Sequence, residues 1–213
     1  MLYLEPVATR VVAFIKSKYM QRRYILFLWL ILSGLNVTAQ VKRYDSSMKL
    51  GKTGYRILCN NKGAEKNSAT INPIGFENTA REISIDIKGR ITRAEVDDLN
   101  NDGYPDLVIY IYNGGTKNTG TVIGVSSDKN QGFAPIFFPD LADDQKLKVG
   151  YMGNDEFSLM EGTLMRRFPV YNTTDTANII PTGITRQIQY RVVPGDRGAQ
   201  KFKIARSYEL NKQ

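Results

Sequence analysis

Apolar and polar residues alternate along much of the chain after residue 40, with the period of two that is typical of a half-buried β-strand. In residues 83–87 three isoleucines alternate with Ser84 and Asp86, and residues 188–192 repeat this pattern near the end. No segment has a sustained apolar stripe with the 3.6-residue period of a helix. The pattern predicts strands at residues 55–59, 83–87, 91–96, 107–112, 121–125, 157–160, 164–170, 188–192 and 202–210.

Short turn sequences separate these segments and indicate which strands are neighbours. Lys88-Gly89-Arg90, Glu161-Gly162 and Pro194-Gly195 each predict a hairpin between the flanking strands. An acidic segment at residues 139–145 predicts a short helical turn. We therefore expect an all-β protein: an antiparallel β-sandwich or flattened barrel of about eight to ten short strands.

Two apolar features predict where the core lies. Residues 107–112 are apolar at every position, which indicates a central strand that is covered on both faces. Cys59 is the only cysteine, so no internal disulfide can form. It alternates onto the same face as Tyr55 and Ile57, which predicts a buried thiol.

The first 39 residues contain the pattern of a secretory signal peptide. Basic residues follow Met20, residues 24–32 form an unbroken apolar run, and small residues precede a cleavage position after Ala39. A membrane span needs about 20 apolar residues, and this run is about half of that. We therefore predict a misassigned start over residues 1–19, a signal peptide over 20–39 and one β domain over 40–213. The protein is expected in the periplasm or secreted, with no membrane span after cleavage.

The expected cleavage changes the charge. Residues 1–39 hold five of the 29 basic and one of the 21 acidic residues, which leaves 24 and 20 and a net charge of +4. These basic residues are scattered among acids in the sequence, whereas a nucleic-acid-binding protein usually carries a clustered basic stripe. We expect no nucleic-acid partner.

The composition also restricts the chemistry. The chain contains no histidine, which excludes Ser-His and Cys-His catalysis and histidine-ligated zinc. Acid clusters at residues 140–144 and 155–156 could serve a glycosidase only if two acids faced each other across a sugar. The sequence predicts a protein that is not an enzyme.

One polar loop, residues 98–106, has the spacing of a cation-binding loop. Oxygen side chains occur at alternating positions, Gly103 would permit a sharp turn, and an acid stands at the ninth position. An EF-hand would need a glutamate at the twelfth position, where Ile109 lies instead. A calcium ion would be held by the side chains of Asp98, Asn100, Asp102 and Asp106 and by the backbone carbonyl of Tyr104.

The same loop has an alternative interpretation. Asp, Asn and Gly form tight turns through local hydrogen bonds between side chain and backbone, without any metal. The sequence does not choose between a calcium site and such a turn.

Five motifs follow one another along the mature chain. They are Val96-Asp97-Asp98-Leu99-Asn100-Asn101-Asp102-Gly103-Tyr104-Pro105-Asp106-Leu107-Val108-Ile109-Tyr110, the glycine-bearing loop from Asn113 to Gly120, Gly150-Tyr151-Met152-Gly153-Asn154-Asp155, Arg166-Arg167-Phe168-Pro169-Val170-Tyr171 and Pro181-Thr182-Gly183-Ile184-Thr185-Arg186. Their order resembles that of the periplasmic inhibitors of I-type lysozyme, and the resemblance covers the chain from about Tyr55 to Val192.

The resemblance implies an antiparallel β fold, a periplasmic location, a homodimer and a loop that enters the lysozyme cleft. That loop would be Gly114-Gly115-Thr116-Lys117-Asn118-Thr119-Gly120. In the family the loop carries a serine, a glycine and then a tyrosine. Here Thr116 matches the serine hydroxyl, but Thr119 stands where the tyrosine belongs.

Two functions follow from these observations. The first is a periplasmic protein that binds a lysozyme through the Gly114–Gly120 loop, with weak or undetectable inhibition because the aromatic anchor is absent. The alternative is a calcium-stabilised binding or structural module of the envelope with an unknown ligand.

Overall fold

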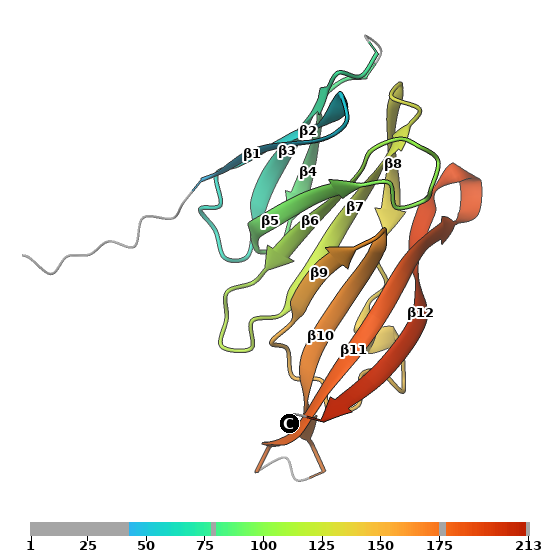
Figure 1. Ribbon diagram of the computed structural model, residues 1–213. Coiled ribbons are helices and arrows are strands. Elements are labelled where there is room, and N and C mark those ends of the chain that lie inside the picture. Colours follow the sequence, from blue (N-terminus) through green and yellow to red (C-terminus); the bar gives the residue numbers. More distant parts are fainter. Residues whose placement is uncertain (1–42, 78–79, 175–177, 212–213) are drawn as a thin grey trace, which may run out of the picture. The chain divides into compact units, whose positions relative to one another are not determined.

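The computed structural model describes residues 43–77, 80–174 and 178–211, which belong to the compact unit Val41–Gln213 (Figure 1). The predicted misassigned start and signal peptide lie outside the described residues. The fold is all-β, as the sequence predicts, with two short 3₁₀ turns, η1 (Leu141–Asp143) and η2 (Asp196–Gly198). Among the described residues no helix has the length and apolarity to cross a membrane.

The described residues form twelve strands in two sheets. A four-stranded sheet has the order β1-β2-β3-β4, and an eight-stranded sheet has the order β5-β6-β7-β8-β12-β11-β10-β9. The strands are β1 (Tyr44–Leu50), β2 (Thr53–Cys59), β3 (Asn67–Ile74), β4 (Ile83–Ile87), β5 (Arg90–Asp97), β6 (Asp106–Tyr112), β7 (Gly120–Asp128), β8 (Gly132–Phe137), β9 (Glu156–Met160), β10 (Thr163–Asn172), β11 (Ile180–Pro194) and β12 (Gln200–Asn211).

Strand β6 is buried on both faces, which confirms the predicted central strand. Leu107, Ile109 and Ile111 point into a core shared with the four-stranded sheet. Val108 and Tyr110 point the other way, into a core shared with strands β9–β12. The half of the large sheet made by β5–β8 therefore lies between two apolar layers, and β9–β12 lie on its far side from β1–β4.

The large sheet curls until its two edge strands approach each other. Arg93 of β5 donates a hydrogen bond from Nη2 to the carbonyl oxygen of Phe157 of β9, at 2.8 Å. Gly162, in the turn after β9, donates from its backbone N–H to Asp97 Oδ2 at 3.0 Å. The sheet is thus a nearly closed, flattened barrel, which falls within the predicted fold class.

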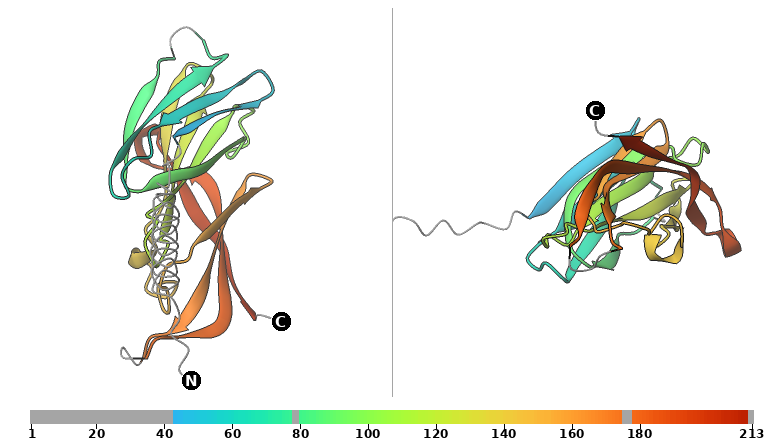
Figure 2. Two further views of the ribbon diagram at one scale, coloured as in Figure 1. Left: turned by 90° about the vertical axis from the view of Figure 1, so that its left-hand side faces the viewer. Right: turned by 90° about the horizontal axis from the view of Figure 1, so that it is seen from below.

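Two of the predicted hairpins are confirmed. Strands β9 and β10 pair across Glu161 and Gly162, whose φ angles of 49° and 66° suit a two-residue hairpin turn of type I′. Strands β11 and β12 form a long, bent hairpin, red in Figure 2. The thiol of Cys59 is also buried, as expected, and donates a hydrogen bond to Asn61 Oδ1 at 3.2 Å.

The hairpin predicted across residues 88–90 is wrong. Strand β4 pairs with β3 and β5 pairs with β6, so the turn carries the chain from one sheet to the other. Gly89 makes this crossing close to β6: its φ is 119°, and a Cβ there would lie 2.7 Å from the carbonyl oxygen of Tyr112. A tight turn between alternating strands does not show whether the strands share a sheet.

Strands β1, β3 and β8 were not predicted. Strand β1 is half-buried to exposed throughout, and β3 and β8 contain Pro73 and Pro135, which count against a strand in sequence reasoning. Strand β8 also makes the one parallel pairing between described strands, with β12, and it spans only two residue pairs. The fold is therefore not purely antiparallel.

Candidate functional site

The loop from Asn113 to Gly120 joins β6 to β7 and is closed by its own hydrogen bonds. The side-chain oxygen of Asn113 accepts from the backbone N–H groups of Gly115 (3.2 Å) and Thr119 (3.1 Å). The backbone N–H of Asn113 donates to Thr119 O at 3.2 Å, and that of Asn118 donates to Gly115 O at 2.8 Å. A single asparagine side chain therefore fixes both ends of the loop.

A second segment, Gly153–Asp155, supports this loop from outside. The carbonyl oxygens of Lys117 and Asn118 accept hydrogen bonds from the backbone N–H groups of Asn154 and Asp155. Gly153 has a φ of +87°, and a Cβ at this position would lie 2.1 Å from Lys117 O. Only glycine permits this close approach, so the segment and the loop are built to fit each other.

The support leaves the tip of the loop open to solvent. Thr116, Lys117 and Asn118 are exposed, whereas Thr119 is half-buried at the base of the loop. In the described part of the chain Lys117 forms no ion pair. Of the predicted partner-binding residues, Gly114 to Asn118 are therefore exposed on a loop whose backbone is held from two sides, whereas Gly120 is buried.

At the end of the loop lies a largely buried network of side chains that the sequence did not predict. Asp155 accepts hydrogen bonds from Arg166 Nε (2.7 Å), Tyr151 Oη (2.6 Å) and the backbone N–H of Gly120 (2.8 Å). Arg166 Nη2 also donates to Tyr151 Oη at 2.9 Å. Burial, and next the hydrogen bond to Asp155, raises the pKa of Tyr151 to about 12. Because Gly120 ends the loop, this network attaches the loop to β10.

Aromatic rings surround the guanidinium group of Arg166. Its Cζ lies 5.1 Å from the ring centre of Tyr151, 5.5 Å from that of Phe157 and 5.7 Å from that of Phe168. Such stacking and the bond to Asp155 compensate for the removal of the charge from water. The sequence did contain a signal for this group: Arg166 lies between Leu164 and Phe168 on the core face of β10.

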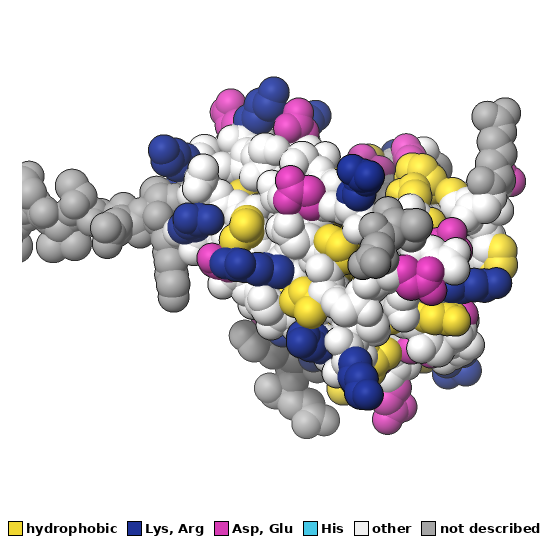
Figure 3. Space-filling model, turned by 90° about the horizontal axis from the view of Figure 1, so that it is seen from above, with side chains coloured by type: hydrophobic (Ala, Val, Ile, Leu, Met, Phe, Trp, Pro, Cys, Tyr) yellow, Lys and Arg dark blue, Asp and Glu magenta, His cyan; other side chains and the backbone are white. Residues whose placement is uncertain are grey.

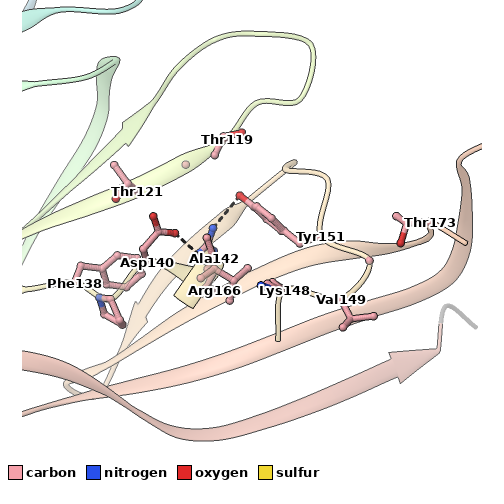
Figure 4. Close-up of a pocket in the computed structure, with 14 residues that line it drawn as sticks. Thr119, Thr121, Phe138, Asp140, Ala142, Lys148, Val149, Tyr151, Arg166 and Thr173 are labelled. Atoms are coloured by element: carbon pink, nitrogen blue, oxygen red, sulfur yellow. Dashed lines mark hydrogen bonds between the residues drawn. The ribbon is translucent and has the colours of Figure 1, made fainter. Parts of the chain in front are cut away.

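A cavity of about 790 Å³ opens beside the base of the loop. Its walls combine hydroxyl groups with aromatic and aliphatic side chains, and Arg166 and Tyr151 meet at one side (Figure 4). Asp140 and Lys148 are exposed residues of its lining. Two residues of the loop, Thr119 and Gly120, also line the cavity, and so does the next residue, Thr121.

Three acids of the two clusters have hydrogen-bond partners within the fold. Asp155 is buried and bound to Arg166, while Asp140 and Asp144 accept backbone N–H bonds in the turn around η1. These acids have structural partners in the described residues. That the protein is not an enzyme stays a prediction.

In the 98–106 loop the side chains bind their own backbone. The two carboxylate oxygens of Asp98 accept from the N–H groups of Asp102 (3.0 Å) and Gly103 (2.9 Å). Asn100 Oδ1 accepts from Asp102 as well (3.0 Å), and Asp102 Oδ1 accepts from Tyr104 (2.9 Å). This is the pattern of an Asx-rich turn.

Asp106 differs from the other acids of this loop because it is fully buried. Its Oδ1 accepts from Ser126 Oγ (2.6 Å) and Ser127 N (3.2 Å), and its Oδ2 accepts from Leu99 N (3.0 Å). Burial raises the pKa of Asp106 to about 6, although these three donors oppose the shift. The carboxylate thus ties the loop to the end of β7.

These hydrogen bonds are the ones expected of the Asx-rich turn, the alternative interpretation of this loop. Among the described residues no three acidic or cysteine side chains surround a common point that could hold a metal ion. Asp106 already uses both oxygens for protein donors. Calcium binding by Asp98, Asn100, Asp102, Tyr104 and Asp106 stays a prediction.

Comparison with known proteins adds no family to this description. No family model matches the chain, and no curated protein matches it significantly.

Proposed function

We propose that the chain is an exported binding protein whose Gly114–Gly120 loop enters the cleft of an I-type lysozyme. One observation carries this proposal: the loop backbone is held by Asn113 and by the Gly153–Asp155 segment, while Thr116, Lys117 and Asn118 are exposed. A loop that is already ordered loses little conformational entropy when it binds, so more of its contact energy appears as affinity.

The exposed side chains match the chemistry of a lysozyme cleft, which carries catalytic carboxylates. Thr116 and Asn118 offer hydrogen-bond donors, and the ammonium group of Lys117 can pair with a carboxylate. The positive net charge of the expected mature chain works against a lysozyme that is itself basic. The proposal therefore concerns local complementarity at the loop rather than attraction between whole molecules.

The affinity should be modest. The family loop carries a tyrosine, and an aromatic anchor in an interface contributes roughly 2 kcal/mol or more. Thr119 stands at the corresponding position, half-buried at the base of the loop and at the edge of the cavity. We expect weak or undetectable inhibition by the natural sequence.

The test is a pull-down of residues 40–213 against I-type, C-type and G-type lysozymes, followed by an activity assay. Binding should favour the I-type enzyme and should weaken with Lys117→Ala. Lys52→Ala removes an exposed lysine from the β1–β2 turn and should change nothing. Retention of all three lysozymes in equal amounts would contradict the proposal, and so would a failure of both the natural chain and Thr119→Tyr to retain the I-type enzyme. Sedimentation of the same sample would test the predicted homodimer.

The cavity supports a second candidate, an envelope module that binds a small polar molecule and is stabilised by calcium. A volume of about 790 Å³ lies within the range of small-molecule sites. Hydroxyl groups of Thr119, Thr121 and Thr173 beside aromatic walls suit a sugar, which has polar edges and an apolar face. A trimer of N-acetylglucosamine should raise the melting temperature of the natural chain but not of Thr121→Trp, which places a bulky ring in the wall of the cavity. No shift in either would contradict this candidate.

A further inference from the structure

Strands β10, β11 and β12 present one face to the apolar core, and several exposed basic side chains lie on the opposite face, where Met165 and Gln187 are buried between them. Strand register identifies the outward residues: Lys203 lies opposite Arg191, and Lys201 lies opposite both Val193 of β11 and Phe137 of β8. Tyr190 and Ile204, one position along, point into the core. The register shifts between Gln189 and Tyr190, so that Arg206 lies opposite Gln189 and points outward like Lys201 and Lys203.

This outward face carries five basic side chains, which we call the basic face. All five are exposed, and none forms an ion pair with a described residue. The five are Arg167, Arg191, Lys201, Lys203 and Arg206.

Acidic side chains are nearly absent from the same surface. Glu156 lies opposite Arg167 in the β9–β10 pairing and is the one acid that the register places on the outward side of strands β9–β12. Glu209 of β12 points to the other side, where it accepts a hydrogen bond from the buried Arg186 at 2.6 Å. The basic face therefore has a local charge of about +4, as large as that expected for the whole mature chain.

Apolar side chains lie at the borders of this charged surface. Phe137 is 61% exposed beside Lys201, and Leu210 is 46% exposed toward the end of β12. Tyr208 is 38% exposed, and its hydroxyl accepts a long hydrogen bond from Arg206. Aromatic and aliphatic groups next to Lys and Arg are the combination that binds the interface of a membrane.

Another face of the molecule has a different charge distribution. On the face shown in Figure 3, Lys and Arg side chains lie next to Asp and Glu side chains. Such a surface has little net field beyond a Debye length of roughly 10 Å. On the basic face, by contrast, the register places five exposed basic side chains and one acid, Glu156.

We propose that the basic face docks the protein on an anionic lipid bilayer. A sheet distributes its charges in two dimensions, about 5 Å apart between strands and about 7 Å apart along a strand. A linear polyanion follows a stripe or a groove, whereas this array extends over three strands and suits an extended anionic surface. The loop and the basic face lie on different elements, so docking and partner binding are separate functions.

Co-sedimentation with vesicles tests the proposal. Residues 40–213 should bind vesicles of mixed phosphatidylglycerol and phosphatidylcholine at low salt and should be released by 0.5 M salt. They should not bind vesicles of pure phosphatidylcholine. Each basic residue near an anionic surface strengthens binding about 5-fold, so Lys201→Gln with Lys203→Gln should lower the partition coefficient about 30-fold. Lys49→Gln with Lys62→Gln, both exposed on or beside the four-stranded sheet, removes the same charge and should have little effect.

Three results would overturn the proposal. The first is no binding to anionic vesicles at low salt, and the second is an equal loss in both double variants. The third is binding to a soluble polyanion such as polyphosphate without binding to vesicles. That result would show that the basic face binds a polymer rather than a bilayer. Melting curves of both double variants should match the natural chain, since all four lysines are exposed.

Discussion

The Nε atom of Arg166 lies 2.7 Å from Oδ1 of Asp155, and these side chains are only 4% and 0% exposed. Asp155 also holds the backbone of Gly120, so this ion pair connects the core of β10 to the end of the candidate binding loop. Removing one partner would leave the other charge buried without compensation. The pair therefore governs both the stability of the fold and the order of the loop.

Arg166→Met tests this connection. The substitution keeps the side-chain volume similar but leaves Asp155 unpaired, and we expect the free energy of unfolding to fall by about 3–5 kcal/mol. Denaturant titration measures the change, and hydrogen exchange at Gly120 should become faster. Arg56→Met is the matched control, because its partner Asp45 is exposed and solvent screens ion pairs at the surface, so its loss of stability should be much smaller. Equal losses in the two variants would refute the assigned role.

Gly153→Ala tests the fit between the loop and its support. The new Cβ would lie 2.1 Å from Lys117 O, so the loop would have to move. Alanine would also be strained by the positive φ at this position. Gly183 has a similar φ of +80° and nothing within 4 Å of the place a Cβ would take. Gly183→Ala therefore measures the backbone strain alone, which costs about 1–2 kcal/mol. We expect a larger loss of stability for Gly153→Ala, together with changed amide chemical shifts in residues 114–120. The same shifts in both variants would show that the contact is unimportant.

The sequence predicted the all-β class, the doubly buried β6 and the β9–β10 and β11–β12 hairpins because these depend on local alternation and on turn chemistry. It did not predict that β4 and β5 belong to different sheets, since strand pairing is a long-range property. It did not predict β3 and β8 because each contains a proline, which counts against a strand. The sequence located the Gly114–Gly120 loop of the candidate site. It did not predict the hydrogen bond from the backbone N–H of Gly120 to Asp155, because the two residues are 35 positions apart and no local pattern encodes their contact.

The buried Asp106 predicts a pH dependence of stability. Burial raises the pKa of Asp106 in the folded state to about 6, so between about pH 4 and 6 the folded state binds a proton more tightly than the unfolded state does. The contribution of this group to stability should therefore be present below pH 4 and lost as the pH rises through 6. Two pKa units correspond to about 3 kcal/mol.

Asp106→Asn removes the titrating group. Denaturant titrations at pH 4, 5, 6 and 7, without calcium, should show a fall in unfolding free energy for the natural chain that the variant lacks. The comparison concerns the slope with pH, so a constant loss from altered hydrogen bonds does not affect it. A natural chain that gains stability over this range, relative to the variant, would reverse the assignment.

Calcium gives a separate test of the 98–106 loop. An ion that binds only the folded state stabilises it by about 2.7 kcal/mol at 100 times its dissociation constant. The melting temperature should then rise with calcium and fall with a chelator, and Asp102→Ala should abolish the response. Asp143→Ala, an exposed acid of η1, should keep it. Equal melting curves with and without calcium would leave the loop an ordinary turn.

The central claim is that the Gly114–Gly120 loop binds I-type lysozyme, and the most direct measurement is the dissociation constant of that complex by calorimetric titration. We predict weak, micromolar binding by the natural chain. Thr119→Tyr should restore the aromatic anchor and tighten binding about 30-fold, and Lys117→Ala should weaken it. Nanomolar inhibition by the natural chain would contradict this account of the loop. Absence of binding by both the natural chain and Thr119→Tyr would contradict the lysozyme proposal itself.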